Sequence, residues 1–418
     1  MRALIALLQT NTVLRRLWLA EVVSMAGDWL SFVAISLLAL RSGEGALALA
    51  SVLVLHTLPS ALLAPIAGLL ADRLEARGAM RVAALIEAGL TVMLVFAAHA
   101  ESLVAVQVLV FVRASVSAAA YPTWGVAMRH VVSDQDLVRA NALNAATWSV
   151  MFSVGMALGG ILTVLGPEIA LAIDAATFVL AALILSGLPR LPPPEAGATT
   201  SLAEAWRHGF AALPGALRHA RADAVLLEAT LAKGSVALTG AGVWLLIHLE
   251  ADWLTGAGSA GLGLGLLHAL RGVGTGVGPA LTASWLGDRT PSAALLRAGQ
   301  VLTAVGLLAV ALAPSPWLAL LGVFVWGLGT GANWTLSSAL IQLKAPRAWL
   351  GRVSALDGAV RTLALSLSVI LAAWAMDAGC ASRAVAVATL VAGAALWVWL
   401  RLRAALLSSR APLRSAAS

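Results

Sequence analysis

The sequence has little charge for its length. Only 11% of its 418 residues are Asp, Glu, Lys or Arg, whereas a typical soluble domain carries about 25%. The apolar set AVILMFWYC makes up 60% of the chain, which is more than a water-soluble fold of this size can bury. This composition excludes a soluble enzyme, a disordered chain and a collagen. It leaves a protein whose surroundings are lipid.

Cysteine, clustered histidine and phosphate-binding loops are also missing. The single cysteine, Cys380, excludes an intramolecular disulfide and a cysteine-based zinc site. The seven histidines never lie three to five residues apart, so no local pair of metal ligands exists. Glycine runs such as residues 327–332 lack the preceding strand that a dinucleotide site needs, and close helix packing accounts for them. We therefore expect no metal and no cofactor.

What the chain does have is a series of long apolar runs. They span 17 or more residues and do not alternate with polar residues, which predicts membrane-spanning helices rather than a β-barrel. We expect twelve spans, over residues 17–40, 46–71, 79–99, 102–130, 137–165, 168–188, 223–249, 257–286, 292–313, 316–343, 350–377 and 381–403.

The positions of the basic residues support this span count. With both termini in the cytoplasm, the cytoplasmic segments hold 21 Lys and Arg, the external loops hold only Arg41 and Arg383, and four lie inside spans. Such an excess on one side follows the positive-inside rule. The net charge of +7 thus reports orientation, and we expect no nucleic-acid partner. We predict a multi-pass protein of the plasma (inner) membrane with both termini cytoplasmic.

One long polar interval divides the spans. It begins with a proline-rich stretch that a helix cannot continue through. The predicted organisation is an N-terminal six-helix half at 1–188, a cytoplasmic linker at 189–222, a C-terminal six-helix half at 223–403 and a cytoplasmic tail at 404–418. Residues 68–73 resemble 284–289, and residues 137–143 resemble 350–356, at offsets of 216 and 213 positions. Parallel six-span repeats with a substrate site between them are typical of transporters.

The segment after the second span carries a recognisable motif. It reads G-x-L-A-D-R-x-G-R-[KR] in the major facilitator superfamily, and this chain supplies Gly68, Leu70, Ala71, Asp72 and Arg73. Glu75 and Ala76 stand at the usual glycine and first basic position. The chain resembles this superfamily over essentially its whole length. The resemblance implies an all-α membrane protein with twelve transmembrane helices in two pseudo-symmetric six-helix halves.

The same resemblance implies a conformational gate at Gly68, Asp72 and Arg73, with Asp288 and Arg289 as the equivalent in the second half. A carboxylate at the cytoplasmic helix end can pair with basic residues or cap a neighbouring helix N-terminus. Such a bond would hold the halves together while the transporter faces outward and would break when it opens inward.

Further stretches resemble the macrolide-efflux and siderophore-exporter branch of drug:proton antiporters. They are residues 11–18, 24–28, 140–143, 342–346 and 351–353.

Two motifs associated with export occur in altered form. Leu109 and Arg113 match L-x-x-x-R-x-x-Q-G, which ends here in Val and Ser. Gly155, Gly159 and Gly160 match G-P-x-x-G-G without its proline, and we expect these glycines to serve helix packing. The resemblance implies export of a small molecule against proton entry.

Asp28 and Arg113 are the preferred functional pair. Each lies about eleven residues into its span, which is roughly 16 Å deep at 1.5 Å per residue. A charge at that depth is costly and is expected to face a cavity or a partner. Protonation of Asp28 would weaken the pair, and the alternative is a static salt bridge that fixes helix register. Glu21, seven residues before Asp28, is either an inner step of a proton path or an interfacial acid.

The resemblance places the first, fourth, seventh and tenth spans around a central cavity, and Trp29, Lys233 and Trp334 lie on three of these spans. Lys233 and Arg271 would attract an anionic substrate group or neutralise Asp174 or Glu87. For Asp174 a structural hydrogen-bonding role is expected. Trp29 and Trp334 could stack on an aromatic or cationic substrate, with ordinary packing as the alternative.

Asp357 and Arg361 are four residues apart on one predicted helix, and we expect them to pair with each other.

The sequence therefore predicts a secondary active transporter that works by alternating access. Its expected cargo is a hydrophobic or amphipathic small molecule, such as a drug, macrolide or siderophore-like compound, with protons as the coupling ion. The alternatives are an importer or uniporter of the same fold and a non-transporting membrane protein. No nucleophile–base pair or metal cluster is visible, so we expect no enzyme activity. The substrate, the coupling ion and the oligomeric state stay open.

Overall fold

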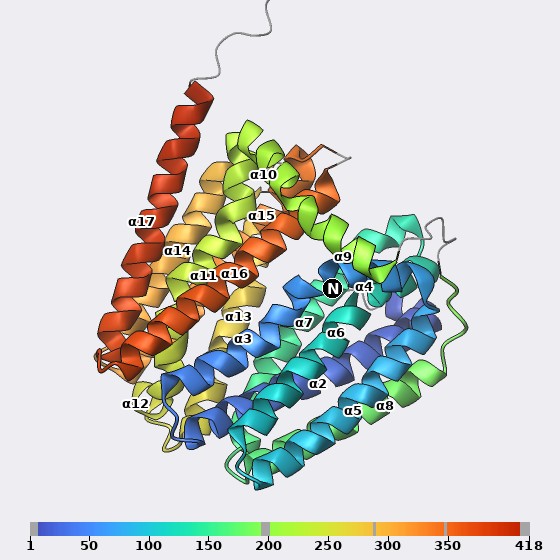
Figure 1. The fold of residues 1–418 in the computed structure, drawn as a ribbon, viewed down its shortest axis with the longest axis horizontal. Coiled ribbons are helices and arrows are strands. Elements are labelled where there is room, and N and C mark those ends of the chain that lie inside the picture. Colours follow the sequence, from blue (N-terminus) through green and yellow to red (C-terminus); the bar gives the residue numbers. More distant parts are fainter. Residues whose placement is uncertain (1–6, 194–200, 287–289, 347–348, 410–418) are drawn as a thin grey trace, which may run out of the picture. The chain divides into compact units, whose positions relative to one another are not determined.

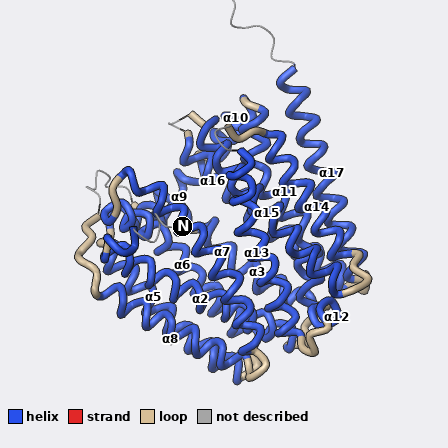
Figure 2. The backbone as a smooth tube through the Cα atoms, turned by 180° about the vertical axis from the view of Figure 1, so that it is seen from behind, coloured by secondary structure: helices blue, strands red, loops and turns tan. Residues whose placement is uncertain are grey.

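The computed structural model describes residues 7–193, 201–286, 290–346 and 349–409. Within these residues every regular element is a helix (Figures 1 and 2). A helix satisfies its backbone N–H and C=O groups within its own segment, as a lipid environment demands. Helices lie over the twelve expected spans, but the one expected over 46–71 is broken in two, and two further helices lie in the predicted linker.

The helix bounds are as follows. The first part of the chain forms α2 (Thr12–Arg41), α3 (Ala46–Leu62), α4 (Ala64–Arg73), α5 (Ala76–His99), α6 (Leu103–Val131), α7 (Asp134–Leu162) and α8 (Pro167–Ser186). The remainder forms α9 (Leu202–Ala211), α10 (Leu213–Ala222), α11 (Ala224–Leu249), α12 (Ala251–Thr255), α13 (Ala260–Leu286), α14 (Ala293–Ala311), α15 (Pro316–Lys344), α16 (Leu350–Asp377) and α17 (Ser382–Ser409).

Short polar side chains begin several of these helices. Asn11 Oδ1 accepts a hydrogen bond from Leu14 N at 2.9 Å at the start of α2, and Ser102 Oγ accepts one from Ala105 N at 3.3 Å at the start of α6. Each bond satisfies one of the N–H groups that have no partner within the helix. Asn11 also donates from Nδ2 to the carbonyl of Val131 at 2.7 Å, so the start of α2 is tied to the end of α6.

Within the described residues, ten helices are long and apolar enough to cross a membrane. The pair α3 and α4 adds an eleventh if it is one span, bent by 56°. Pro65 lies in the first turn of α4, where it cannot donate to the carbonyl of residue 61 and its ring would clash with that carbonyl in a continuous helix. The single helix expected over 46–71 is therefore a broken one.

The expected eighth span is α13. It has 27 residues, seven of them glycine, and it is not among the ten helices that are apolar enough to cross a membrane. Glycine has no side chain and adds little to the hydropathy of a span, but it lets neighbouring backbones approach closely.

The predicted linker contains two helices that the sequence analysis did not anticipate. α9 and α10 are ten residues each and follow the proline-rich stretch. Asp223 then begins α11, because its Oδ1 accepts hydrogen bonds from Val225 N at 2.8 Å and Leu226 N at 3.1 Å.

By internal packing, the chain divides into two units. Unit 1 comprises residues 1–206 and 248–273, and unit 2 comprises residues 207–247 and 274–418. In unit 1, α2 packs against α7 and α8, and α5 packs against α6 and α8 (Figure 1). In unit 2, α14 packs against α15 and α17. The division into two six-helix halves joined by the linker at 189–222 is inferred from the order of the spans, and it stays a prediction.

Glycines allow the closest approaches in unit 1. A Cβ on Gly159 of α7 would lie 2.6 Å from the Leu30 carbonyl oxygen of α2, and one on Gly155 would lie 2.7 Å from Trp29 Cβ. Gly160 faces the other way, where its Cβ would lie 2.8 Å from Gly265 Cα of α13. The three glycines expected to serve packing therefore lie where α7 meets two different helices.

Candidate functional site

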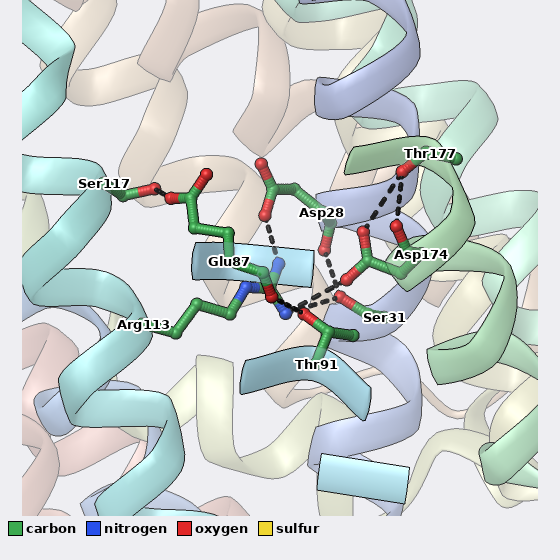
Figure 3. A network of polar contacts seen from close by, with 8 residues as sticks. All are labelled: Asp28, Ser31, Glu87, Thr91, Arg113, Ser117, Asp174 and Thr177. Carbon is green, nitrogen blue, oxygen red and sulfur yellow. Dashed lines mark hydrogen bonds and ion pairs between the residues drawn. The ribbon is translucent and has the colours of Figure 1, made fainter. Parts of the chain in front are cut away.

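Arg113 of α6 lies at the centre of a buried polar network in unit 1 (Figure 3). Its Nη2 contacts Asp28 Oδ1 of α2, its Nη1 lies 3.0 Å from Asp174 Oδ2 of α8, and Nη1 also donates to Ser31 Oγ at 3.3 Å. The structure thus brings Asp28 and Arg113 together, as the depth of the two residues predicted, and adds Asp174 to the same guanidinium. We call these residues, with Glu87, the Arg113 network.

Glu87 of α5 is the third carboxyl group of the network. Ser117 of α6 donates to its Oε1, and its side chain is buried. Thr91, one turn further along α5, donates to the backbone carbonyl of Glu87 at 2.8 Å. Glu87 interacts electrostatically with Asp28, Arg113 and Asp174. Two acidic residues, Asp28 and Asp174, therefore contact one guanidinium, and Glu87 lies in the same network (Figure 3).

Asp174 reaches Arg113 because Gly27 leaves room for it. A Cβ at position 27 would lie 2.4 Å from Asp174 Oδ1 and 2.1 Å from Thr177 Oγ1. The Asp174 side chain is fully buried, whereas that of Asp28 is 34% exposed. A structural hydrogen-bonding role is predicted for Asp174, with neutralisation by Lys233 or Arg271 as one alternative. The structure corrects that alternative, because the ion pair of Asp174 is made with Arg113.

Glu21 lies outside this network. It is about 10 Å from Asp28 along α2, at 1.5 Å per residue. With its amide oriented to donate, Asn144 Nδ2 of α7 lies 2.6 Å from Glu21 Oε1.

An aromatic cluster adjoins Trp29 in unit 1. The Trp29 ring lies edge-on to Phe152 at 4.7 Å and to Trp148 at 5.6 Å between ring centroids. Arg271 of α13 lies with its Cζ 5.0 Å from the centroid of Phe152. Arg271 is thus a neighbour of the aromatic cluster.

Unit 2 holds a second buried ion pair. Lys233 Nζ of α11 lies 2.6 Å from Asp357 Oδ2 of α16 and donates to Ser338 Oγ at 3.0 Å. Arg361 lies instead with its Cζ 5.6 Å from the Trp334 ring centroid, and Lys233 Nζ lies 5.0 Å from the same centroid. The expected Asp357–Arg361 ion pair is therefore wrong, because the buried Lys233 takes the carboxylate.

The candidate gate residues lie at the end of α4. Asp72 is exposed and Arg73 is half-buried, and a Cβ on Gly68 would meet nothing within 4 Å. Asp288 and Arg289 lie outside the described residues.

Glu75, which departs from the family motif, has a clear structural role. Its carboxylate accepts hydrogen bonds from Gly78 N and from Leu191 N, each at 2.7 Å, and Leu191 O accepts one from Ala76 N at 3.0 Å. Partial burial alone would raise the pKa of Glu75, but the N–H donors of Leu191 and Gly78 and the charge of Arg77 outweigh it and lower the pKa. Glu75 thus begins α5 and ties it to the start of the linker.

The comparisons with known proteins agree with this architecture. Residues 17–369 match the Major Facilitator Superfamily. The chain is 28% identical over 244 residues to an uncharacterized MFS-type transporter, y4rN, of Sinorhizobium fredii (strain NBRC 101917 / NGR234). That alignment covers 58% of each chain, so this chain spans little more than half the length of the relative it matches.

Solved transporters share the fold. The nucleoside transporter NupG aligns with a TM-score of 0.71 at 15% identity, covering 95% of this chain and 99% of that one. A bacterial homolog to the human lysosomal transporter Spinster, in an inward-facing and unoccupied conformation, aligns with a TM-score of 0.67 at 18% identity, covering 95% of each chain. The chain is all-helical in the part described, and it belongs to the Major Facilitator Superfamily as a membrane transporter rather than an enzyme.

Proposed function

We propose that this transporter exports a hydrophobic or amphipathic small molecule in exchange for protons, by alternating access. The observation that carries the proposal is the composition of the Arg113 network. The network holds three carboxyl groups and a single guanidinium: Asp28 and Asp174 contact Arg113, and Glu87 interacts with it electrostatically. Such an excess of acid is expected where a protein binds and releases a proton within the membrane.

The charge balance supports proton binding. If all three carboxyl groups were ionised, the network would hold two uncompensated negative charges away from water, which costs several kcal/mol per ion. Neutralising one or two of them with protons removes that cost. A protonated carboxyl can donate to a neighbouring oxygen, whereas an ionised one can only accept. The network is therefore most stable when at least one of its carboxyl groups is protonated. The number of protonated groups depends on the environment of the network.

The two aspartates differ in access to solvent, which suggests different roles. Asp174 is fully buried and holds Arg113 in either state, whereas Asp28 is 34% exposed and can exchange protons. Protonation of Asp28 removes one of the two anionic partners of Arg113. The guanidinium is then free to shift toward Asp174, which gives the network two arrangements, as a coupled transporter requires.

The second unit supplies features suited to a substrate. The Trp334 side chain is 48% exposed, and Lys233 and Arg361 lie over its ring. An aromatic face flanked by two cations suits an aromatic substrate with an anionic group. Trp29 is the corresponding candidate in unit 1. Glu21 is proposed as the inner step of the proton path, and the residues 68–73 at the end of α4 as part of the gate.

Transport into inverted vesicles with an imposed pH gradient tests this proposal. A growth screen of a deletion strain against toxic amphipathic compounds first supplies a substrate. We expect wild-type vesicles to accumulate it only when the lumen is acidic. In an inverted vesicle the lumen corresponds to the outside of the cell. Asp28→Asn should abolish gradient-driven accumulation while retaining substrate exchange without a gradient. Asp136→Asn, which alters an exposed ion pair with Arg139, is the matched control.

The outcomes separate the alternatives. Gradient-driven accumulation by Asp28→Asn at the wild-type rate would contradict coupling through the Arg113 network. Equilibration of substrate without any response to the gradient would identify a uniporter. Accumulation only with the opposite gradient would identify an importer.

A further inference from the structure

Glu228 of α11 holds two arginines at one end of unit 2, away from the Lys233–Asp357 pair. Arg297 of α14 donates from Nε to Glu228 Oε1 at 2.9 Å and from Nη2 to Oε2 at 2.8 Å. Arg401 of α17 lies with its Nε 3.6 Å from Oε1, too far for a hydrogen bond. One carboxylate thus meets two guanidinium groups, and the cluster keeps one positive charge. The Glu228 side chain is buried, but those of Arg297 and Arg401 are 38% and 36% exposed.

The positions of these three residues along their helices are those expected near a membrane surface. Glu228 and Arg297 are each four residues after the first residue of their helices, which is about 6 Å along the axis. Arg401 lies two residues beyond Trp399, the last residue of the apolar span in α17. The predicted orientation places this end of the three helices at the cytoplasmic side.

A groove of about 230 Å³ lies among the same three helices. It is lined by thirteen residues of α11, α14 and α17, among them Thr239, Gln300, Ala304, Ala394 and Trp397. Most of the lining is apolar. Two of its polar members make hydrogen bonds to helix backbone: Thr239 Oγ1 donates to Ser235 O at 2.7 Å, and Gln300 Nε2 donates to Ala232 O at 3.1 Å. The groove therefore presents a hydrocarbon-like surface.

The groove continues directly from the charged cluster. On α14, Gln300 and Ala304 follow Arg297 by three and seven residues; on α17, Trp397 and Ala394 precede Arg401 by four and seven. These spacings place the groove residues on the same helix faces as the two arginines. The Arg401 guanidinium also lies 5.0 Å from the Trp397 ring centroid, which holds it at the mouth of the groove.

We propose that unit 2 binds an anionic phospholipid at this place, with its phosphate on Arg297 and Arg401 and one acyl chain in the groove. The cluster supplies net positive charge at headgroup depth, and guanidinium forks match phosphate geometry. Basic pockets between membrane helices are suited to anionic headgroups. The apolar groove next to the arginines suits an acyl chain rather than a second charged group. The site therefore fits a molecule that is anionic at one end and apolar along its length.

Lipid titration of the detergent-purified full-length protein, followed by native mass spectrometry, tests the proposal. The probes are phosphatidylglycerol and phosphatidylcholine of equal chain length. We expect one tightly bound phosphatidylglycerol on the wild type and weaker binding of phosphatidylcholine. Arg401→Gln should weaken the affinity for that first phosphatidylglycerol by about fivefold, as expected for losing one positive charge at a membrane surface. It leaves the Glu228–Arg297 pair in place, so the unit should still fold.

A second variant tests the groove and a third serves as control. Ala394→Phe fills the groove and leaves both arginines unchanged. It should weaken the binding of phosphatidylglycerol to a similar extent. Arg352→Gln removes an exposed arginine of α16 that lies over Trp349, away from the groove, and it should bind like the wild type.

Three results would overturn the proposal. They are equal affinity for the two lipids, unchanged binding by both Arg401→Gln and Ala394→Phe, and displacement of bound lipid by glycerol 3-phosphate at concentrations comparable to those of the lipid. The last would assign the arginines to a free phosphate compound rather than a lipid.

Discussion

At the scale of single residues, the balance of buried charge governs this protein. Arg113 is the positive group of a network with three acids, and Asp174 is fully buried beside it. Arg113→Leu would leave that carboxylate without its counter-charge, so we expect a loss of about 3 kcal/mol of stability. Asp28→Asn should cost less, because Asp28 is one-third exposed and Asp174 still neutralises Arg113. Thermal unfolding of the purified protein in detergent measures both.

The control for this comparison is Arg139→Gln, which removes an exposed ion pair with Asp136 and should change stability by about 1 kcal/mol or less. Combining Arg113→Leu with Asp174→Asn should recover part of the lost stability, because the buried carboxylate is then neutral. An Arg113→Leu protein that melts with the wild type would mean that Arg113 is not the group that neutralises Asp174.

The sequence predicted how deep the charged side chains lie in the membrane better than it predicted which of them form pairs. Counting residues along each span placed Asp28 and Arg113 at one level, and the two are in contact. It could not show that α8 carries Asp174 to the same guanidinium, because that depends on which helices are neighbours and on the space left by Gly27. The expected Asp357–Arg361 pair failed for the same reason, since the competing cation, Lys233, comes from another helix.

At the scale of helices, the apolar runs predicted where spans lie but not how closely they pack. The span bounds follow from hydropathy and from polar residues at the ends, and the helices match them. The bend between α3 and α4 and the two linker helices were missed. Proline inside an apolar run is compatible with a continuous, kinked or broken helix, and the short amphipathic helices α9 and α10 carry no membrane-span pattern.

Helix packing in unit 1 can be tested at Gly159. Gly159→Ala would place a Cβ 2.6 Å from the Leu30 carbonyl oxygen of α2, so the two helices must separate. We expect a lower melting temperature, corresponding to about 1–3 kcal/mol for an overpacked contact. Gly89→Ala in α5 is the control, since nothing lies within 4 Å of its added Cβ; it should be neutral or stabilising by up to about 1 kcal/mol. Equal melting temperatures for the two variants would mean that α7 and α2 do not depend on this glycine.

At the scale of the whole molecule, orientation rests on the distribution of basic residues, and the number of spans rests partly on α13. This helix is not among the ten that are long and apolar enough to cross a membrane. Five spans, α11 and α13 to α16, separate the linker from the loop that joins α16 to α17. An odd number places the linker and that loop on opposite faces of the membrane, whereas four spans would place them on the same face.

Cys380 provides a direct test of this parity. It is exposed, lies in the loop between α16 and α17, and is the only cysteine in the chain, so a maleimide reports on one position. We expect a membrane-impermeant maleimide to label it in intact spheroplasts. A Cys380→Ser, Ser201→Cys variant moves the thiol to the exposed start of α9 and should be labelled only in inverted vesicles. Reversed labelling of both would place the termini outside. Labelling of both from the same side would mean that α13 does not cross the membrane.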